Sequence, residues 1–82
     1  MKHESHPAIT KRLKRAEGHM RSIIAMIEDG RPCVDLAQQL HAVEKAIGSA
    51  KRELIHDHIE HCLDDDRHHG SLKELKQLAK YL

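Results

Sequence analysis

The sequence has almost no aromatic residues and no long apolar stretch. Its 82 residues include one tyrosine, Tyr81, and neither phenylalanine nor tryptophan. A core without large rings has to be built from Ile, Leu, Ala and Met, which suits helices packed against helices. No stretch approaches the roughly 18 apolar residues that a membrane-spanning helix needs, and no basic-then-apolar signal opens the chain. These absences exclude a membrane protein and lead us to expect a cytoplasmic one.

Cysteine is scarce as well, and neither sign of charge dominates. The chain has two cysteines, and its 14 basic and 13 acidic residues give a formal net charge of +1. Two cysteines in a chain without an export signal indicate reactive or metal-binding thiols rather than a disulfide framework. The length allows one domain, residues 1–82, and excludes a large enzyme or a two-domain binding protein. What the chain has in excess is histidine, with nine residues.

Apolar residues recur with the three- and four-residue spacing of amphipathic helices. The first predicted helix starts at Pro7 and ends at the segment 29–32, where glycine terminates one helix and proline starts the next. The second runs over residues 32–65 and the third over residues 71–82. No segment alternates with period two, so the sequence predicts an all-α fold with three helices per chain. The apolar stripes of the first two helices are Ile9, Leu13, Ala16, Met20, Ile23 and Ile27, then Leu36, Leu40, Val43, Ile47, Ala50 and Leu54.

The second predicted helix is too long for a compact chain of this size. A helix over residues 32–65 is about 50 Å long, whereas a compact chain of 82 residues has a radius of gyration of about 12 Å. The apolar stripe of the helix would then be exposed to water. We therefore expect a homodimer in which two chains pair with two-fold symmetry as an antiparallel four-helix bundle.

Three potential metal ligands lie along one edge of the apolar stripe of the second helix. Cys33, His58 and Cys62 all fall within about 80° of Leu36 when each residue turns the helix by about 100°. Cys33 is about 37 Å from His58 along the helix axis, so it cannot join the other two within one chain. In an antiparallel dimer whose axis passes near residues 46–48, Cys33 of one chain meets His58 and Cys62 of the other. Such a dimer holds two identical sites.

Two thiolates and one imidazole favour Cu(I), and the same set also suits Zn(II). The alternative is that both cysteines are small core residues and that His58 is a hydrogen-bonded histidine of the dimer interface. His3 and His6 lie in an N-terminal arm, residues 1–6, that we expect to be flexible. If this arm folds onto the site, it adds the nitrogen ligands that Ni(II) and Co(II) prefer. His61 lies near the stripe, on its other side, and is a candidate for a residue that supports the ligands.

The first predicted helix carries a basic stripe opposite its apolar stripe. A solvated helix face is the usual meaning of such a stripe. An oligomer would repeat the stripe and match phosphates along a DNA duplex. No helix-turn-helix, zinc-finger or basic-zipper pattern is present, so DNA binding would depend on the assembled surface. The basic residues are Lys11, Lys14, Arg15 and Arg21, with Arg12 on the flank of the stripe.

Four stretches of the sequence match a known pattern: Arg12–His19, Arg31–Cys33, Gln38–Val43 and Asp57–Cys62. Over roughly residues 8–65 they make the chain resemble the CsoR/RcnR family of small all-helical metal-sensing repressors. The resemblance implies an antiparallel dimer that is usually paired into a tetramer, a dimer of dimers. It also implies that the metal-free form binds operator DNA and that the metal-bound form releases it.

The resemblance also implies roles for single residues. The spacing of Cys33, His58 and Cys62 equals that of the copper-sensing members. The nickel and cobalt branch uses an N-terminal histidine and often a histidine where this chain has Cys62. Persulfide-sensing members have both cysteines but lack the histidine, so His58 argues against that branch. The position of Arg12 is implicated in DNA binding, and Glu74 is similar to a third-helix glutamate that couples the metal site to the DNA face.

Three functions stay open on the sequence. The main prediction is a repressor that binds operator DNA and releases it when Cu(I) binds at Cys33, His58 and Cys62. The second is a repressor that responds to Ni(II) or Co(II), with His3 or His6 added to the site. The third is a helical interaction or metal-buffering module that holds zinc and has no role at DNA. The chain has no substrate-binding motif, so we expect neither an enzyme nor a small-molecule substrate.

Overall fold

The computed structural model describes residues 6–64 and 71–82, except for the side chains of residues 61–64 and 71. Over these residues it contains three helices, α1 (His6–Glu28), α2 (Cys33–Asp64) and α3 (Ser71–Ala79), and no strand. The predicted all-α fold with three helices is confirmed. Residues 1–5 of the predicted N-terminal arm lie outside the described residues, and His6, the last residue of that arm, is the first residue of α1.

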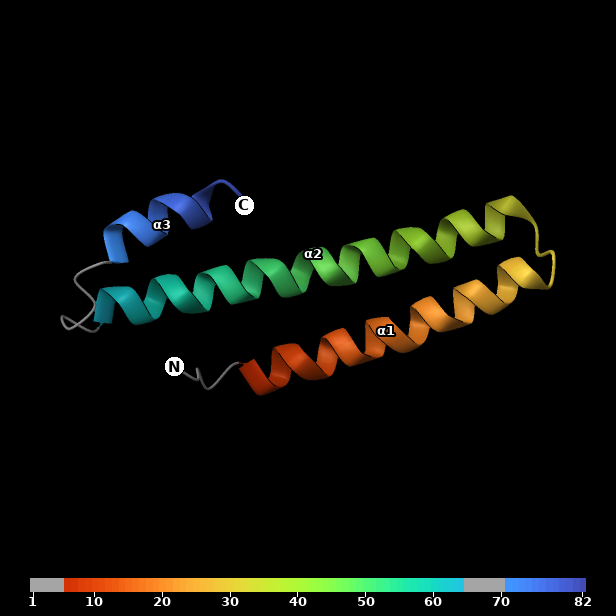
Figure 1. Cartoon of the computed structure of the whole chain (residues 1–82), viewed down its shortest axis with the longest axis horizontal. Coiled ribbons are helices and arrows are strands. Elements are labelled where there is room, and N and C mark those ends of the chain that lie inside the picture. The colour runs from red at the N-terminus through yellow and green to blue at the C-terminus, as the bar shows by residue number, and fades with distance from the viewer. Residues whose placement is uncertain (1–5, 65–70) are drawn as a thin grey trace.

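The three helices lie side by side, with α2 in the middle (Figure 1). α1 and α2 run antiparallel along most of their length and pack against each other. α3 folds back along the C-terminal half of α2, on the side away from α1, and makes no contact with α1. Within the described part of the chain, α2 thus contacts both other helices. A change at its C-terminal end can therefore affect α1 and α3 together.

The turn between α1 and α2 uses a backbone conformation that favours glycine. Gly30 has a φ of 73°, in the left-handed region. Its N–H donates to the carbonyl of Ile27 at 3.0 Å, and the N–H of Arg31 donates to the carbonyl of Met26 at 3.0 Å. These two bonds form a Schellman motif, which satisfies carbonyl groups at the end of α1. The turn therefore lies in the segment where the sequence predicts it.

A single chain buries only part of the two predicted apolar stripes. On α1 the buried positions are Ile9, Ala16 and Ile23, which recur every seventh residue. The positions of the α1 stripe that lie between them are exposed. Along the stripe of α2, buried and exposed positions alternate in the same way. Each helix therefore presents a second row of apolar side chains that nothing within the described chain covers. Up to residue 60, the buried residues of α2 are Val43, Ala50 and Ile55, and the exposed stripe positions of the two helices are Leu13, Met20, Ile27, Leu40, Ile47 and Leu54.

The molecule is too thin to bury both faces of the α1–α2 hairpin. It measures 54 × 23 × 13 Å, and its radius of gyration of 16.9 Å exceeds the value of about 12 Å for a compact chain of this length. Its smallest dimension is close to the diameter of one helix with side chains, about 10–12 Å. The prediction that the long helix leaves apolar surface exposed in one chain is confirmed. None of the described helices is long and apolar enough to cross a membrane.

Two valines of α2 test which positions belong to the core of the single chain. Val43 is 4% exposed, whereas Val34 is 69% exposed. Val43→Ala removes two buried methyl groups and leaves a cavity, so we expect the free energy of unfolding to fall by about 2–3 kcal/mol. The matched control Val34→Ala should change it by less than about 0.5 kcal/mol.

Urea unfolding followed by circular dichroism measures both changes. All samples need the same protein concentration, because the stability of an oligomer depends on it. Equal losses for the two variants would contradict the assignment of Val43 to the core.

Candidate metal centre

Cys33 and His58 lie towards opposite ends of α2. Cys33 is the first residue of this helix, and its thiol is free and exposed. His58 follows about 37 Å further along the same helix at 1.5 Å per residue. Among the described residues, no group of three His, Cys, Asp or Glu side chains in one chain is arranged to hold a metal ion. A site that contains both Cys33 and His58 therefore requires a second chain.

The ring of His58 faces α3, where it meets Glu74. Nε2 of His58 lies 3.4 Å from Oε1 of Glu74, and this nitrogen is buried. A histidine that binds a metal through one ring nitrogen commonly donates its other N–H to a carboxylate. Glu74 is placed for this role at Nε2 of His58. The structure thus brings together two of the residues that the sequence associated with the metal site.

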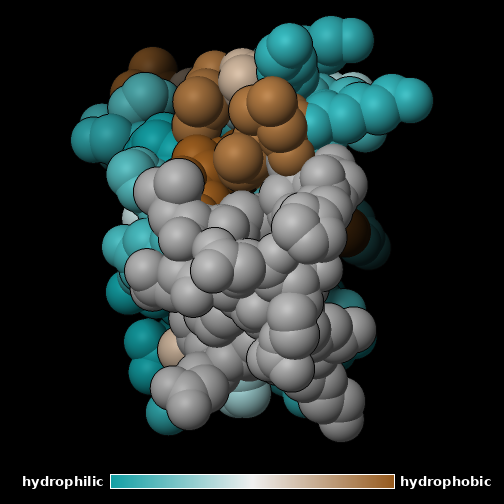
Figure 2. Space-filling model, turned by 90° about the vertical axis from the view of Figure 1, so that its left-hand side faces the viewer, coloured by the Kyte–Doolittle hydropathy of each residue, from teal (hydrophilic) through white to brown (hydrophobic). Residues whose placement is uncertain are grey.

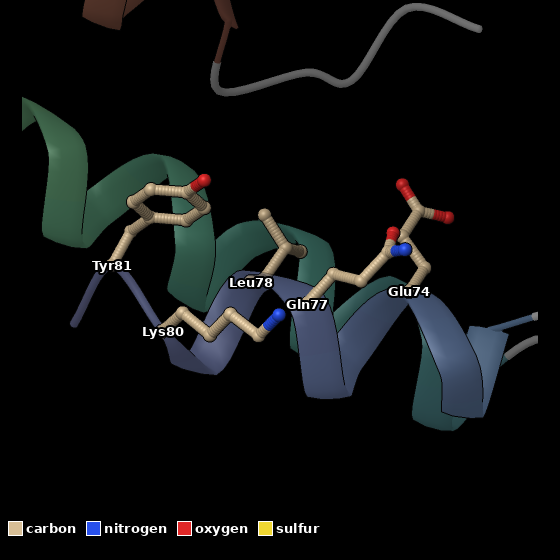
Figure 3. Close-up of a pocket in the computed structure, with 5 residues that line it drawn as sticks. All are labelled: Glu74, Gln77, Leu78, Lys80 and Tyr81. Atoms are coloured by element: carbon tan, nitrogen blue, oxygen red, sulfur yellow. The ribbon is translucent and has the colours of Figure 1, made fainter.

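Glu74 also borders a hollow of about 360 Å³ on the surface of α3. Figure 3 shows Glu74, Gln77 and Leu78 of α3 projecting towards the same side as Tyr81, which lies in the turn after the helix. The Glu74 side chain is 56% exposed, so its carboxylate is open to solvent while it remains close to His58. Apolar side chains gather over α3 when the molecule is viewed from the end at which this helix begins (Figure 2). α3 therefore offers both apolar and charged surface beside the candidate centre.

His6 approaches the same end of α2 from α1. Its Nε2 atom lies 3.9 Å from Oδ2 of Asp57, the residue that precedes His58. The Asp57 side chain is only 13% exposed, and its Oδ2 atom is buried. His6 therefore lies close to the candidate centre, on the α1 side of the molecule.

Three other residues that the sequence associated with the metal site are not fully placed. Cys62 and His61 belong to α2, close to its C-terminal end, but their side chains lie outside the described part of the chain. His3 lies outside the described residues altogether. Roles for these three residues in metal binding remain predictions.

The basic residues of α1 are exposed, and two of them line a hollow between α1 and α2. Arg12 and Arg15 border this hollow of about 300 Å³ together with His19 and, from α2, Ser49. Guanidinium groups bind phosphate through paired hydrogen bonds, so two of them beside a hydroxyl form a suitable phosphate-binding surface. The remaining basic residues of the predicted stripe are exposed on α1 outside this hollow: Lys11, Lys14 and Arg21.

The sequence did not predict two contacts that residues lining this hollow make with α2. Arg12 donates a hydrogen bond of 2.7 Å to Oε2 of Glu53, and Nε2 of His19 lies 2.5 Å from Oε1 of Gln39. Both contacts join α1 to α2. In an antiparallel hairpin, residues that face one another have a nearly constant sum of positions. The predicted turn at residues 29–32 was therefore a signal that could have placed Arg12 opposite Ser49, within about one helical turn of Glu53.

An apolar groove lies on the other side of the hairpin. At 100° per residue, Arg12 and Arg15 fall on one side of the buried row of α1, and Leu13 falls on the other. Leu13, Ile47 and Leu54 line a groove of about 190 Å³, and each of these three is between 40% and 44% exposed. The hairpin thus separates a basic face from an apolar face.

The comparison with protein families gives one match that covers nearly the whole chain. The family described as "Metal-sensitive transcriptional repressor" matches residues 5–82. This match confirms the family resemblance noted on the sequence. It includes all three helices and the candidate metal and DNA contacts described above, apart from His3.

Curated relatives and a solved structure are similar to the chain. The copper-sensing transcriptional repressor CsoR of Mycobacterium ulcerans is 37% identical over 78 residues, which cover 90% of this chain and 67% of that protein. CsoR of Bacillus subtilis is 46% identical over 57 residues, which cover 70% of this chain and 56% of that protein. The chain thus spans about half to two thirds of the length of these relatives.

The solved structure is that of the nickel-responsive transcriptional regulator InrS, with a TM-score of 0.83 and 31% sequence identity. The match covers 100% of this chain and 98% of that chain, so the arrangement of the three helices is shared. Together with the family match over residues 5–82, this shows that the chain belongs to the family of metal-sensitive transcriptional repressors.

Proposed function

We propose that the chain acts as a repressor that binds operator DNA without metal and releases the DNA when Cu(I) binds. The proposal is supported by the family and by the copper-sensing relatives. It is also supported by the donor set, because two soft thiolates and one imidazole suit Cu(I). Cys33 from one chain and His58 with Cys62 from a second chain would hold the ion.

The observation that carries the proposal is the register of the exposed apolar residues of α2. Leu40, Ile47 and Leu54 recur every seventh residue, with Ile47 at the centre. When two α2 helices pair antiparallel about Ile47, Leu40 of one chain meets Leu54 of the other. The groove beside Leu13 then accepts apolar side chains of the second copy. This pairing gives the thin hairpin a second layer and completes a four-helix bundle.

The same register brings the metal ligands together. Cys33 lies two heptads before Ile47 and therefore faces the position two heptads after Ile47 in the second copy. That position is residue 61, which lies between His58 and Cys62. The pairing that covers the apolar residues thus also places Cys33 beside the two other ligands, at two equivalent sites per dimer.

Metal and DNA binding would be coupled through α2. Glu74 contacts His58 and so connects α3 to this part of α2. Arg12 and Arg15 line a hollow between α1 and α2, so its shape depends on how these helices pack. Metal that fixes the His58 end of α2 would favour a packing that fits DNA less well. Allosteric coupling of this kind typically amounts to about 1–3 kcal/mol, or about 5- to 150-fold in affinity.

Pairing of two such dimers into a tetramer completes the proposed assembly. Exposed apolar residues of the C-terminal region support it, since Leu72, Tyr81 and Leu82 are each at least 63% exposed. A tetramer would repeat the basic face of α1 four times. Phosphate contacts from several chains would then add along one DNA duplex.

A nickel response is the second candidate function. It is favoured by the contact of His6 with Asp57, beside His58. The likeness to the nickel-responsive regulator InrS supports it as well. An added imidazole would supply the nitrogen-rich ligand set that Ni(II) prefers.

Ile47→Glu tests the proposed pairing of two chains. Ile47 lies at the proposed two-fold axis, so the substitution would bring two carboxylates face to face in an apolar interface, and we expect the dimer to dissociate. Val34→Glu is the matched control, since Val34 is exposed and lies on the opposite side of α2 from Val43. Sedimentation velocity measures both assemblies, with helix content checked by circular dichroism. A folded Ile47→Glu dimer would contradict the pairing.

Metal-dependent release of DNA tests the proposed function. The probe is a fluorescently labelled DNA duplex that the wild-type protein selects from random sequences. Binding is measured by the fluorescence anisotropy of this duplex in the absence of oxygen. One equivalent of Cu(I) per chain should weaken wild-type binding by about 5- to 150-fold. Cys33→Ser should keep DNA binding but lose this response, because one of three ligands is gone. His41→Ala, which removes an exposed histidine of α2, should behave as wild type.

The same assay separates copper from nickel. A protein without residues 1–5 and with His6→Ala should keep its Cu(I) response. If Ni(II) is the effector, this protein should lose a Ni(II) response that the wild type has. Full release by Cu(I) in Cys33→Ser would contradict the proposed copper site, and failure of the wild type to select any DNA would contradict the repressor function.

A further inference from the structure

Arg12 is already engaged by an acidic side chain when no DNA is bound. It donates its 2.7 Å hydrogen bond to Glu53, and this contact is also an ion pair. The two side chains are 50% and 48% exposed, so the pair lies at the surface. Arg12 also lines the basic hollow with Arg15 and Ser49, where a phosphate would sit. A phosphate that binds Arg12 must therefore compete with Glu53.

The geometry places the Glu53 carboxylate at the edge of that hollow. Glu53 follows Ser49 by one turn of α2, so both side chains project from the same face of the helix. A carboxylate here acts on a phosphate in two ways: it occupies the guanidinium, and it repels the phosphate charge. An exposed ion pair is weak, so DNA can displace it at modest cost.

We propose that Glu53 is a built-in competitor of DNA phosphate for Arg12 and so limits the affinity of the protein for DNA. This inference rests on the proposed function, because it assigns a role in the DNA binding of that same face. Glu53 acts through Arg12 and does not itself bind DNA. It also lies less than two turns from His58 on the same helix, so a displacement of α2 at the metal centre moves Glu53 relative to α1.

Glu53→Gln tests the competition in the full-length, metal-free protein. The substitution keeps the size of the side chain but removes its charge, so binding to the selected duplex should tighten by about three- to tenfold. Loss of the exposed ion pair with Arg12 accounts for up to about fivefold of this tightening. Loss of the repulsion between the Glu53 carboxylate and the DNA phosphate accounts for the rest. Glu44→Gln is the matched control, since it removes the same charge from an exposed position on the opposite side of α2. It should change the affinity by less than about twofold.

A double-mutant cycle with Arg12→Gln distinguishes competition from a general effect of charge. If Glu53 acts mainly through Arg12, Glu53→Gln should tighten binding by no more than about twofold in the Arg12→Gln background, because only the loss of repulsion is then left. Glu53→Ala provides a second variant and should also tighten binding to wild-type Arg12. Unchanged circular dichroism and retained metal-dependent release show that the variants are folded.

Three results would overturn the inference. The first is equal tightening by Glu53→Gln and Glu44→Gln. The second is tightening of the same size in the Arg12→Gln background as in the wild type, and the third is unchanged or weaker binding by both Glu53 variants. Each of these leaves DNA binding by the wild type intact, so the proposed function would survive. A wild-type protein that binds no DNA would overturn both proposals.

Discussion

The α1–α2 hairpin is one layer thick, and most of the proposed biology depends on that constraint. Two packed helices cover only the sides that face each other. Ile23 and Val43 are buried in this contact, whereas Leu40 and Ile47 remain about half exposed. An extent of 13 Å leaves no room for a second layer within the described chain. Because a helical domain needs two layers to bury its apolar surface, the proposed second copy would supply the layer that the hairpin lacks.

The same constraint explains how a small chain can sense a ligand. Cys33 and His58 lie too far apart on one rigid helix to share an ion, so a site that contains both forms only when two chains pair. Metal would then report on the assembly as a whole rather than on one chain. The contacts of His6 with Asp57, Arg12 with Glu53 and His58 with Glu74 connect the C-terminal half of α2 to both other helices. In the proposed mechanism, an ion bound at this end would therefore change the basic face of α1 without touching it.

Local rules predict the helices and their turn, because hydrophobic spacing and the glycine at position 30 act over a few residues. The separation of Cys33 and His58 also follows from the helix rise alone. The sequence cannot say which apolar positions face α1 and which face a second chain, because Ala16 and Leu13 obey the same period. That choice depends on how the two helices are rotated against each other. The family resemblance linked Glu74 to the metal site, but its contact with His58 was not predicted, since no periodicity fixes where α3 folds back.

The most direct test of the account is whether two defective chains can make one working metal site. Cys33→Ser and the double variant His58→Ala, Cys62→Ser should each bind no Cu(I) tightly in competition with a chelator. When they are unfolded, mixed in equal amounts and refolded together, about half of the dimers are mixed, and each mixed dimer has one of its two sites intact. We predict recovery of about one quarter of the wild-type Cu(I) capacity. A mixture that binds no more than its separate components would contradict a site shared between two chains.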